Sequence, residues 1–316
     1  MELIPRAAIL SPAEITRADH HPGAVYLARL APGSRGTMRQ VLGVVADVLS
    51  SGRATLETLA WSSLRYQHTQ AVRTHLAERY APATANKALS ALRGVLTECF
   101  RLGLMTAEDH ARATDLPNVK GQSAPRGRAL KSGELVALFG ACDPSTAQGA
   151  RDAALLAVLY GAGLRRAEAV TLDLADFDAE LGELRIRSGK GRKARTVYVT
   201  NGARDALIAW LEVRGAGEGP LFLAIDKADN LRAGRITTGA VYLILARLQR
   251  AAKVKPFSPH DCRRSYITAL LAAGNSIAVV QKLAGHASVN TTARYDRSDE
   301  DAKRKAAETL HVPFAG

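Results

Sequence analysis

Tyr295 stands in a polar segment, HASVNTTARY, which starts at His286 and lies about twenty residues before the end of the chain. Aromatic residues make up only 5% of the chain, so a tyrosine placed here is conspicuous. A phenol oxygen can act as a nucleophile in covalent catalysis. The structural alternative is a ring that covers the core. We predict a helix from Ile277 to about Ala284 and a second from Ser288, with the tyrosine two turns along it.

Two basic groups in the second half of the chain could serve such a nucleophile. Arg165 follows a glycine and a leucine in what reads as one helical run, and Glu168 lies three residues on, on the same helical face. Lys190 lies between two glycines in a basic turn. Taken singly, Arg165 and Glu168 are expected to form a structural ion pair, and Lys190 is expected to lie in an exposed turn.

The segment 257–274 predicts a helix whose N-terminus favours anions. Ser258 is a good N-cap, a proline suits the first helical position, and Asp261 can complete a capping box. His260 and Arg263 then lie one turn apart near the free N–H groups of the helix start, where a phosphate is favoured. The alternative is a capped surface helix with unrelated charges.

Together these residues favour a phosphate-binding site. Two arginines, one lysine and two histidines are all phosphate-binding side chains. Arginine offers a planar fork of donors that matches phosphate oxygens, and lysine offers a compact charge with a transferable proton. Tyr295 is the oxygen nucleophile that stands out beside them.

The composition points to a globular protein with a polyanionic partner. The 316 residues favour two domains, and 43 basic against 30 acidic residues give a net charge of +13, which favours nucleic acid. No run of 18 apolar residues and no signal peptide is evident, so no membrane association is expected. Three widely spaced cysteines form no zinc or disulfide pattern, so we expect a cytoplasmic, nucleoid-associated protein.

The first part of the chain, 1–116, is predicted to be entirely helical. Amphipathic patterns predict helices over 36–52, 64–80 and 82–104. We find no strand pattern there.

Residues 117–131 are predicted to form a basic linker. They hold two prolines, two glycines and no acidic residue. Lys120, Arg126, Arg128 and Lys131 give the segment a charge of +4, so it is unsuited to fold against a basic protein. It either lies along a phosphate backbone or is a solvated tether.

Residues 132–316 combine helices with one predicted hairpin. Helical patterns cover 131–142 and 149–172 and resume from Thr238. Between them, apolar Leu184 and Ile186 alternate with arginines, SGKGRK turns the chain, and two alternating valines follow. The fold class expected is therefore mainly α with a small antiparallel β-sheet.

In order, spacing and local wording, these motifs resemble the tyrosine recombinase, or phage integrase, family over nearly the whole chain. Six positions match: Arg165 in GLRRAE, Lys190 in GKGRK, His260 and Arg263 in HDCRR, His286 in LAGH, and Tyr295 in TTARY. Residues 82–96 also resemble the helical core-binding domain of that family. Two departures are Cys262, where leucine is usual, and Arg264, where many members have histidine.

The resemblance implies a site-specific DNA recombinase or integrase that needs neither metal nor cofactor. Tyr295 would attack a DNA phosphorus, forming a 3′-phosphotyrosyl link and releasing a 5′-hydroxyl. His260 is the candidate acceptor of the phenol proton, and Lys190 the candidate acid for the leaving oxygen.

The same resemblance gives the remaining side chains supporting roles. Arg165 and Arg263 would stabilise charge on the phosphate oxygens, and His286 would donate a hydrogen bond to them. Glu168 would orient the first arginine.

The architecture implied is a clamp around double-stranded DNA, with a SAM-like core-binding domain in 1–116 and a catalytic domain in 132–316. Expected DNA contacts are Lys120, Arg126, Arg128, Lys131, Arg192, Lys193 and Arg264. Strand exchange joins two duplexes, so the working unit would be a tetramer. The tail, 299–316, could dock on a neighbouring subunit or on its own.

Two other functions fit parts of this pattern. A type IB topoisomerase would use similar chemistry to relax supercoils without joining partners. A non-catalytic DNA-binding protein could share the fold. However, it would have no physical reason to keep the expected residue at every catalytic position, as this chain does.

Overall fold

The chain divides into two compact units, Met1–Arg126 and Gly127–Gly316, each with a hydrophobic core of its own. The computed structural model describes residues 20–121, 127–187, 194–295, 304 and 307–308. The boundary between the units falls within the segment 117–131.

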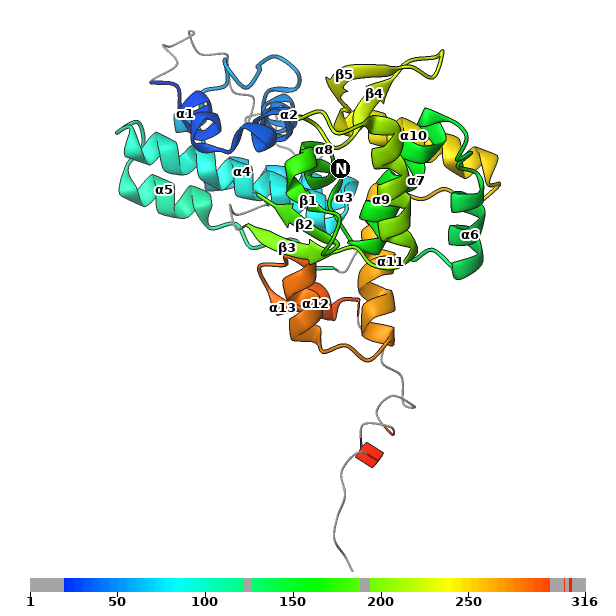
Figure 1. Ribbon diagram of the computed structural model, residues 1–316. Coiled ribbons are helices and arrows are strands. Elements are labelled where there is room, and N and C mark those ends of the chain that lie inside the picture. Colours follow the sequence, from blue (N-terminus) through cyan, green and yellow to red (C-terminus); the bar gives the residue numbers. More distant parts are fainter. Residues whose placement is uncertain (1–19, 122–126, 188–193, 296–303, 305–306, 309–316) are drawn as a thin grey trace, which may run out of the picture. The chain divides into compact units, whose positions relative to one another are not determined.

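The first unit is built around one long central helix, α4 (Pro82–Arg101), which packs against α1, α2, α3 and α5 (Figure 1). Its apolar positions recur every three or four residues, so Leu89, Leu92 and Leu96 are fully buried. The surrounding helices are α1 (Pro22–Arg29), α2 (Pro32–Ser50), α3 (Tyr66–Arg79), α5 (Ala107–Thr114) and the short η2 (Trp61–Ser63). The three predicted helices are confirmed as α2, α3 and α4, and no named strand occurs in the described part of this unit.

The second unit combines helices with two small antiparallel sheets. Its helices are α6 (Ser132–Gly140), α7 (Ala147–Gly161), α8 (Arg166–Thr171), η3 (Leu174–Asp176), α9 (Gly202–Arg214), α10 (Thr238–Ala251), α11 (Pro259–Ala272), α12 (Ile277–Ala284) and α13 (Val289–Ala293). Its strands are β1 (Phe177–Asp178), β2 (Glu183–Ile186), β3 (Arg195–Tyr198), β4 (Leu223–Ile225) and β5 (Leu231–Arg235).

The predicted hairpin is confirmed as β2 and β3. These strands pair antiparallel, with Leu184 opposite Val197 and Ile186 opposite Arg195, and β1 adds a third strand beside β2. The alternation places Leu184, Ile186 and Val197 in the core. The turn that joins the two strands, 188–193, lies outside the described residues.

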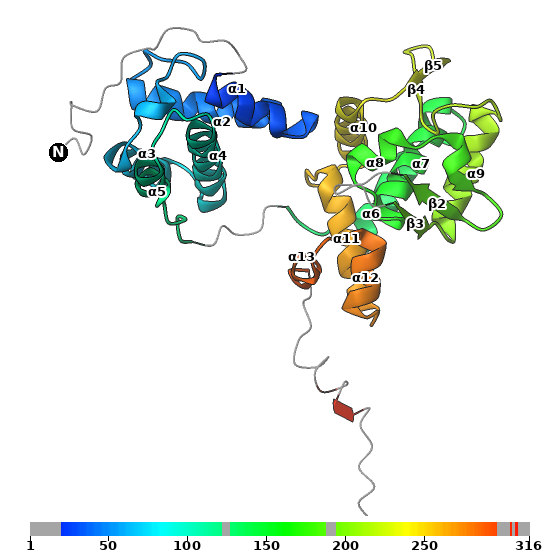
Figure 2. The same cartoon turned by 90° about the vertical axis from the view of Figure 1, so that its left-hand side faces the viewer.

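A second sheet, β4 with β5, was not predicted. Its strands are three and five residues long and mostly half-exposed, so they carry little of the apolar alternation that marks a strand. This sheet stands at the opposite end of the unit from α12 and α13 (Figures 1 and 2).

The helix expected over 149–172 is broken in two, and that prediction was wrong in this respect. Between α7 and α8 the chain turns at Gly163, which has φ +61°. A Cβ at this position would lie 2.2 Å from the ring of Tyr266. Only glycine combines this backbone conformation with so close an approach, so the break places Arg165 at the N-cap of α8 rather than inside a helix.

The ends of the expected linker are attached to the two units. On one side, Asn86 bonds both the N–H and the carbonyl of Val119. On the other, Arg128 donates to the carbonyls of Lys255 and Pro256 and to Glu134. Backbone carbonyls and a carboxylate offset the charge of this arginine, which the composition of the segment does not reveal. Residues 122–126 lie outside the described residues.

No helix in the described part of the chain has the length and apolar character needed to cross a membrane.

Replacing Gly163 by alanine should destabilise the second unit. The positive φ and the contact with the Tyr266 ring together are expected to lower the free energy of unfolding by roughly 2–4 kcal/mol. Urea titration followed by circular dichroism measures this change. The matched control is Gly140→Ala at the end of α6, where a Cβ meets nothing within 4 Å, and it should be neutral or slightly stabilising. Equal stability of the two variants would contradict this account of the break.

Candidate active site

The first arginine of the site is held by the start of its own helix. The N–H of Arg165 donates to Glu168 Oε2 (2.8 Å), and its Nη1 donates to Glu168 Oε1 (2.7 Å). Its Nη2 donates to the carbonyl of Gly285 (3.0 Å), 120 residues along the chain. The side chain keeps 30% of its surface exposed, so one edge of the guanidinium is still open to a ligand.

A second arginine binds the same carboxylate. Arg195, the first residue of β3, donates to both oxygens of Glu168 (2.9 and 2.8 Å) and to the carbonyl of Leu283 (3.2 Å). A Cβ at Gly285 would lie 2.9 Å from Arg195 Nε, so a glycine is needed at this turn. One buried carboxylate therefore joins α8, β3 and the end of α12.

The charge of Glu168 is stabilised strongly by these contacts. Burial alone would raise its pKa, but hydrogen bonds from Arg195 and from the Arg165 N–H outweigh that effect and lower the pKa to about 2. The carboxylate is therefore ionised at neutral pH although the residue is only 4% exposed.

Arg263 lies deepest in the site. It is 1% exposed, and its two amino groups donate to the carbonyls of Gly163 (2.6 Å) and Ala284. Burial, with the nearby charge of Arg165, lowers its pKa to about 10, so it remains cationic at neutral pH. As predicted, His260 and Arg263 lie one turn apart near the start of α11, and Asp261 closes the capping box by accepting from the N–H of Ser258 (2.8 Å).

The tyrosine hydroxyl lies within hydrogen-bonding distance of a histidine. Tyr295 Oη lies 3.3 Å from His260 Nε2. Desolvation, with the positive charges of Arg263 and Arg264, lowers the pKa of His260, although the residue retains access to solvent. The ring is therefore neutral at pH 7 and can accept a proton.

The second histidine is fixed by a threonine. His286 Nδ1 lies 2.8 Å from Thr292 Oγ1, and its ring stacks on that of Tyr295 with centroids 6.2 Å apart. Burial, then the charges of Arg263 and Arg165, lower the pKa of His286 to about 4, so it too is neutral. If the threonine donates to Nδ1, Nε2 carries the ring proton and can donate it to a phosphate oxygen.

The helix that was expected to carry the tyrosine ends before it, so that prediction was wrong. The break at Gly285 (φ +61°) and the N-cap at Ser288 are confirmed, but α13 ends at Ala293. Tyr295 therefore lies beyond the helix, and its N–H donates to the carbonyl of Thr292 (2.9 Å). A five-residue helix has too few internal hydrogen bonds to continue without packing along its length.

The expected DNA contacts differ in their surroundings. Lys120 and Lys131 are exposed, whereas Arg128 is bound to protein carbonyls. The guanidinium of Arg264 lies over the Tyr295 ring, with 5.2 Å from Cζ to the ring centroid. The expected residues Arg126, Lys190, Arg192 and Lys193 lie outside the described residues.

Two residues of the site were not predicted, Arg195 and Thr292. The hairpin register contains a signal for the first, because Arg195 stands opposite the buried Ile186 and so points to the core face, where it needs a carboxylate partner. The sequence gives no such signal for Thr292, because a threonine at this position could serve several structural roles.

Replacing Glu168 by glutamine should make the stability of the protein less dependent on pH. The carboxylate contributes stability above its ordinary pKa of 4.5, and this contribution is lost as the pH falls from 4.5 towards 2. At pH 7 the variant should lose about 3 kcal/mol, and its deficit should narrow between pH 5 and pH 3. Urea titrations across this range measure it. The exposed Glu218→Gln is the control, and a constant deficit at every pH would contradict the expectation.

Comparison with known proteins shows which family this chain resembles. The model of the Phage integrase family matches residues 128–302. A tyrosine recombinase of Synechococcus elongatus is 36% identical over 241 residues, which cover 73% of this chain and 72% of the relative. Tyrosine recombinase XerC of Myxococcus xanthus is 30% identical over 298 residues, 90% of this chain and 96% of the relative. Tyrosine recombinase XerD of Xanthomonas campestris is 32% identical over 292 residues, 85% and 86% of the two chains.

Solved structures share the fold. The Tn1549 transposon integrase in complex with transposon right end DNA matches with a TM-score of 0.68 at 13% identity, covering 92% of this chain and 98% of that chain. A lambda integrase dimer bound to a COC′ core site matches with a TM-score of 0.63 at 17% identity, covering 89% and 94%. With a family match over more than half of its length and relatives that align over nearly all of it, this chain belongs to the phage integrase family and is a site-specific tyrosine recombinase.

Proposed function

We propose that this recombinase cuts and rejoins double-stranded DNA through a 3′-phosphotyrosyl bond to Tyr295. The observation that carries the assignment is the 3.3 Å contact between the tyrosine hydroxyl and His260 Nε2. In the attack, the phenol oxygen bonds to phosphorus, its proton passes to His260, and the bond to the 5′ oxygen breaks. A neutral imidazole is the form that accepts this proton.

Two arginines would stabilise the negative charge that develops on the phosphate oxygens. Arg165 has an open edge and can donate directly, as the 30% exposure of its side chain allows. Arg263 is buried nearby, and burial destabilises its charged form and so lowers its pKa. A phosphate bound beside it would stabilise that charged form. His286 adds a neutral donor. One preorganised donor of this kind is typically worth about 3 kcal/mol in the transition state.

Glu168 supports this chemistry without touching the substrate. It fixes the orientation of Arg165 through two hydrogen bonds, and through Arg195 it ties the hairpin to the same point. Lys190, in the turn of that hairpin, is the proposed acid that protonates the leaving 5′ oxygen.

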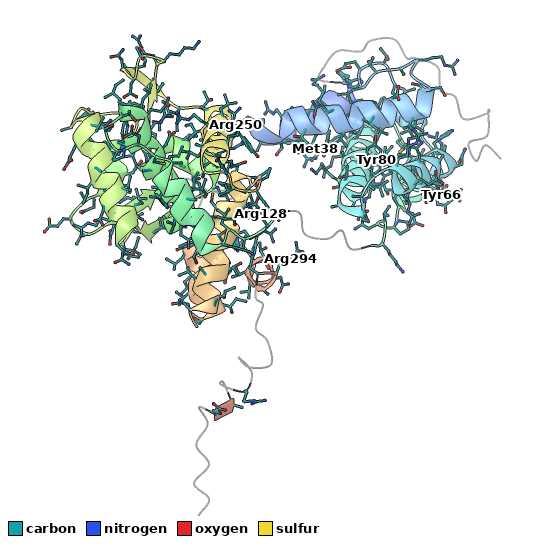
Figure 3. The ribbon with its side chains drawn as sticks, turned by 90° about the vertical axis from the view of Figure 1, so that its right-hand side faces the viewer. Met38, Tyr66, Tyr80, Arg128, Arg250 and Arg294 are labelled. Atoms are coloured by element: carbon teal, nitrogen blue, oxygen red, sulfur yellow. The ribbon has the colours of Figure 1, made fainter. Side chains whose placement is uncertain are left out.

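DNA is the proposed partner, and the net charge of +13 supports it. In the second unit, the labelled side chains of Arg250, Arg128 and Arg294 follow one another along one edge in the view of Figure 3. Arg250 and Arg294, with Lys120 and Lys131, supply basic groups for the phosphate backbone, whereas Arg128 is bound to Glu134 and to backbone carbonyls. The first unit would also bind DNA; the Tn1549 transposon integrase, which shares the fold, has been solved in complex with transposon right end DNA.

Strand exchange requires two duplexes, so we propose a tetramer on DNA, assembled from pairs such as the dimer described for lambda integrase. Residues 299–316, nearly all outside the described part of the chain, could link neighbouring subunits. The three cysteines are buried and free, which supports action in a reducing cytoplasm.

Replacing Tyr295 by phenylalanine should abolish covalent attachment to DNA. The change removes one oxygen and keeps the ring, so DNA affinity should stay near that of the unaltered protein. On a nicked, labelled site the unaltered protein should form an adduct in the presence of EDTA, visible on a denaturing gel. Tyr198→Phe, at an exposed tyrosine of β3, is the control and should form it normally.

Two results would overturn the assignment. A covalent band in the Tyr295→Phe variant would identify a different nucleophile, and loss of the band of the unaltered protein in EDTA would contradict the metal-free mechanism. Relaxation of a two-site plasmid without separation of two products would favour a topoisomerase.

Replacing Lys190 by alanine should slow cleavage of a normal phosphodiester by removing the acid. A substrate with sulfur in the 5′ bridging position has a better leaving group that needs no proton, so it should restore the rate of the variant. Single-turnover cleavage of both substrates measures the effect. Equal slowing on both would exclude the general-acid role.

A further inference from the structure

The side chain of Arg264 lies against the nucleophile rather than towards open solvent. Its guanidinium carbon is 5.2 Å from the centroid of the Tyr295 ring, within the range of a cation–π contact. The side chain is 12% exposed, compared with 30% for Arg165. A phosphate contact in a DNA groove would be expected from a more open arginine.

A fixed carboxylate lies close to this arginine. Arg264 Nε lies 3.8 Å from Asp261 Oδ1, one helical turn earlier on α11. That carboxylate cannot swing away, because its Oδ2 accepts from the N–H and hydroxyl of Ser258 (2.8 Å each) and its Oδ1 accepts from the N–H of Arg128 (2.9 Å). The start of α11 therefore places a fixed negative charge beside the guanidinium that faces the tyrosine ring.

A cation in this place acts more strongly as the reaction proceeds. The neutral ring attracts it through the negative face of its π-system. When the phenol oxygen gives its proton to His260 and bonds to phosphorus, negative charge spreads from oxygen into the ring, and the attraction grows. An interaction that is stronger in the transition state than in the ground state raises the rate.

We propose that Arg264 is a positioning residue for the nucleophile, which holds the ring of Tyr295 facing the phosphate and stabilises the charge that develops on it. The proposal rests on the assignment of Tyr295 as the nucleophile. It gives this chain a cation where the family resemblance leads one to expect a histidine, and it replaces the expectation that Arg264 contacts the DNA backbone.

The test is single-turnover adduct formation on a nicked site at saturating DNA, from pH 6 to pH 9. Arg264→Met removes the charge and should slow the adduct about tenfold, the size of a partly buried cation–π contact. Arg264→Lys keeps the charge and should recover the rate to within about threefold. DNA affinity should change less than threefold in both.

A matched control lies in the same unit. Arg166 makes the same kind of contact with Tyr242, with 4.3 Å from its Cζ to the ring centroid, and Arg166→Met should leave the rate unchanged. Arg264→His supplies a test within a single folded protein, should the methionine variant unfold. Its rate relative to the unaltered protein should fall as the pH rises from 6 to 8 and the imidazole loses its charge.

Three results would overturn the proposal. They are an unchanged rate in both Arg264→Met and Arg264→His, an equal loss in Arg264→Met and Arg264→Lys, and a loss that disappears at saturating DNA, which would indicate a backbone contact. Failure of the nucleophile assignment looks different, because the unaltered protein would then form no adduct or Tyr295→Phe would still form one.

Discussion

The buried carboxylate of Glu168 is the interaction on which the rest of the site depends. A negative charge that is 4% exposed needs cations, and it has two, Arg165 from the start of α8 and Arg195 from β3. Each arginine then has donors left over, which reach the carbonyls of Gly285 and Leu283 at the end of α12. One charge thus fixes three elements that are far apart in the sequence, at a point where solvent cannot compete for their hydrogen bonds.

Two glycine turns make this convergence possible. At Gly163 and Gly285 the backbone has a positive φ, and at both a side chain packs where a Cβ would stand. Arg263 joins the two turns, because its amino groups bind the carbonyls of Gly163 and Ala284. The turns present Arg165 and His286 to the same space, so glycine's access to a positive φ serves to place side chains of the proposed site.

The electrostatics of the cluster suit a reaction at phosphate. Burial lowers the pKa of His260 and His286, and the cations, which outnumber the one carboxylate at the centre, lower it further, so both rings are neutral. Neutral imidazoles can accept the phenol proton and donate to a phosphate oxygen, while the arginines remain charged. An incoming phosphodiester would supply the negative charge that the site lacks.

The sequence by itself determined the three longest helices of the first unit, the β2–β3 hairpin and the capping box of α11, because each depends on local spacing or on short motifs. It also singled out six residues of the cluster: Arg165, Glu168, His260, Arg263, His286 and Tyr295. It did not reveal the break at Gly163, the short α13 or the β4–β5 sheet, whose local patterns are weak. Only the tertiary structure decided that Arg195 shares Glu168 with Arg165, that Arg263 is buried under the turns, and that Arg264 faces Tyr295. Those pairings join residues up to about a hundred positions apart. The packed core decides which elements come within hydrogen-bonding distance of a buried charge, and no local pattern in the sequence contains that information.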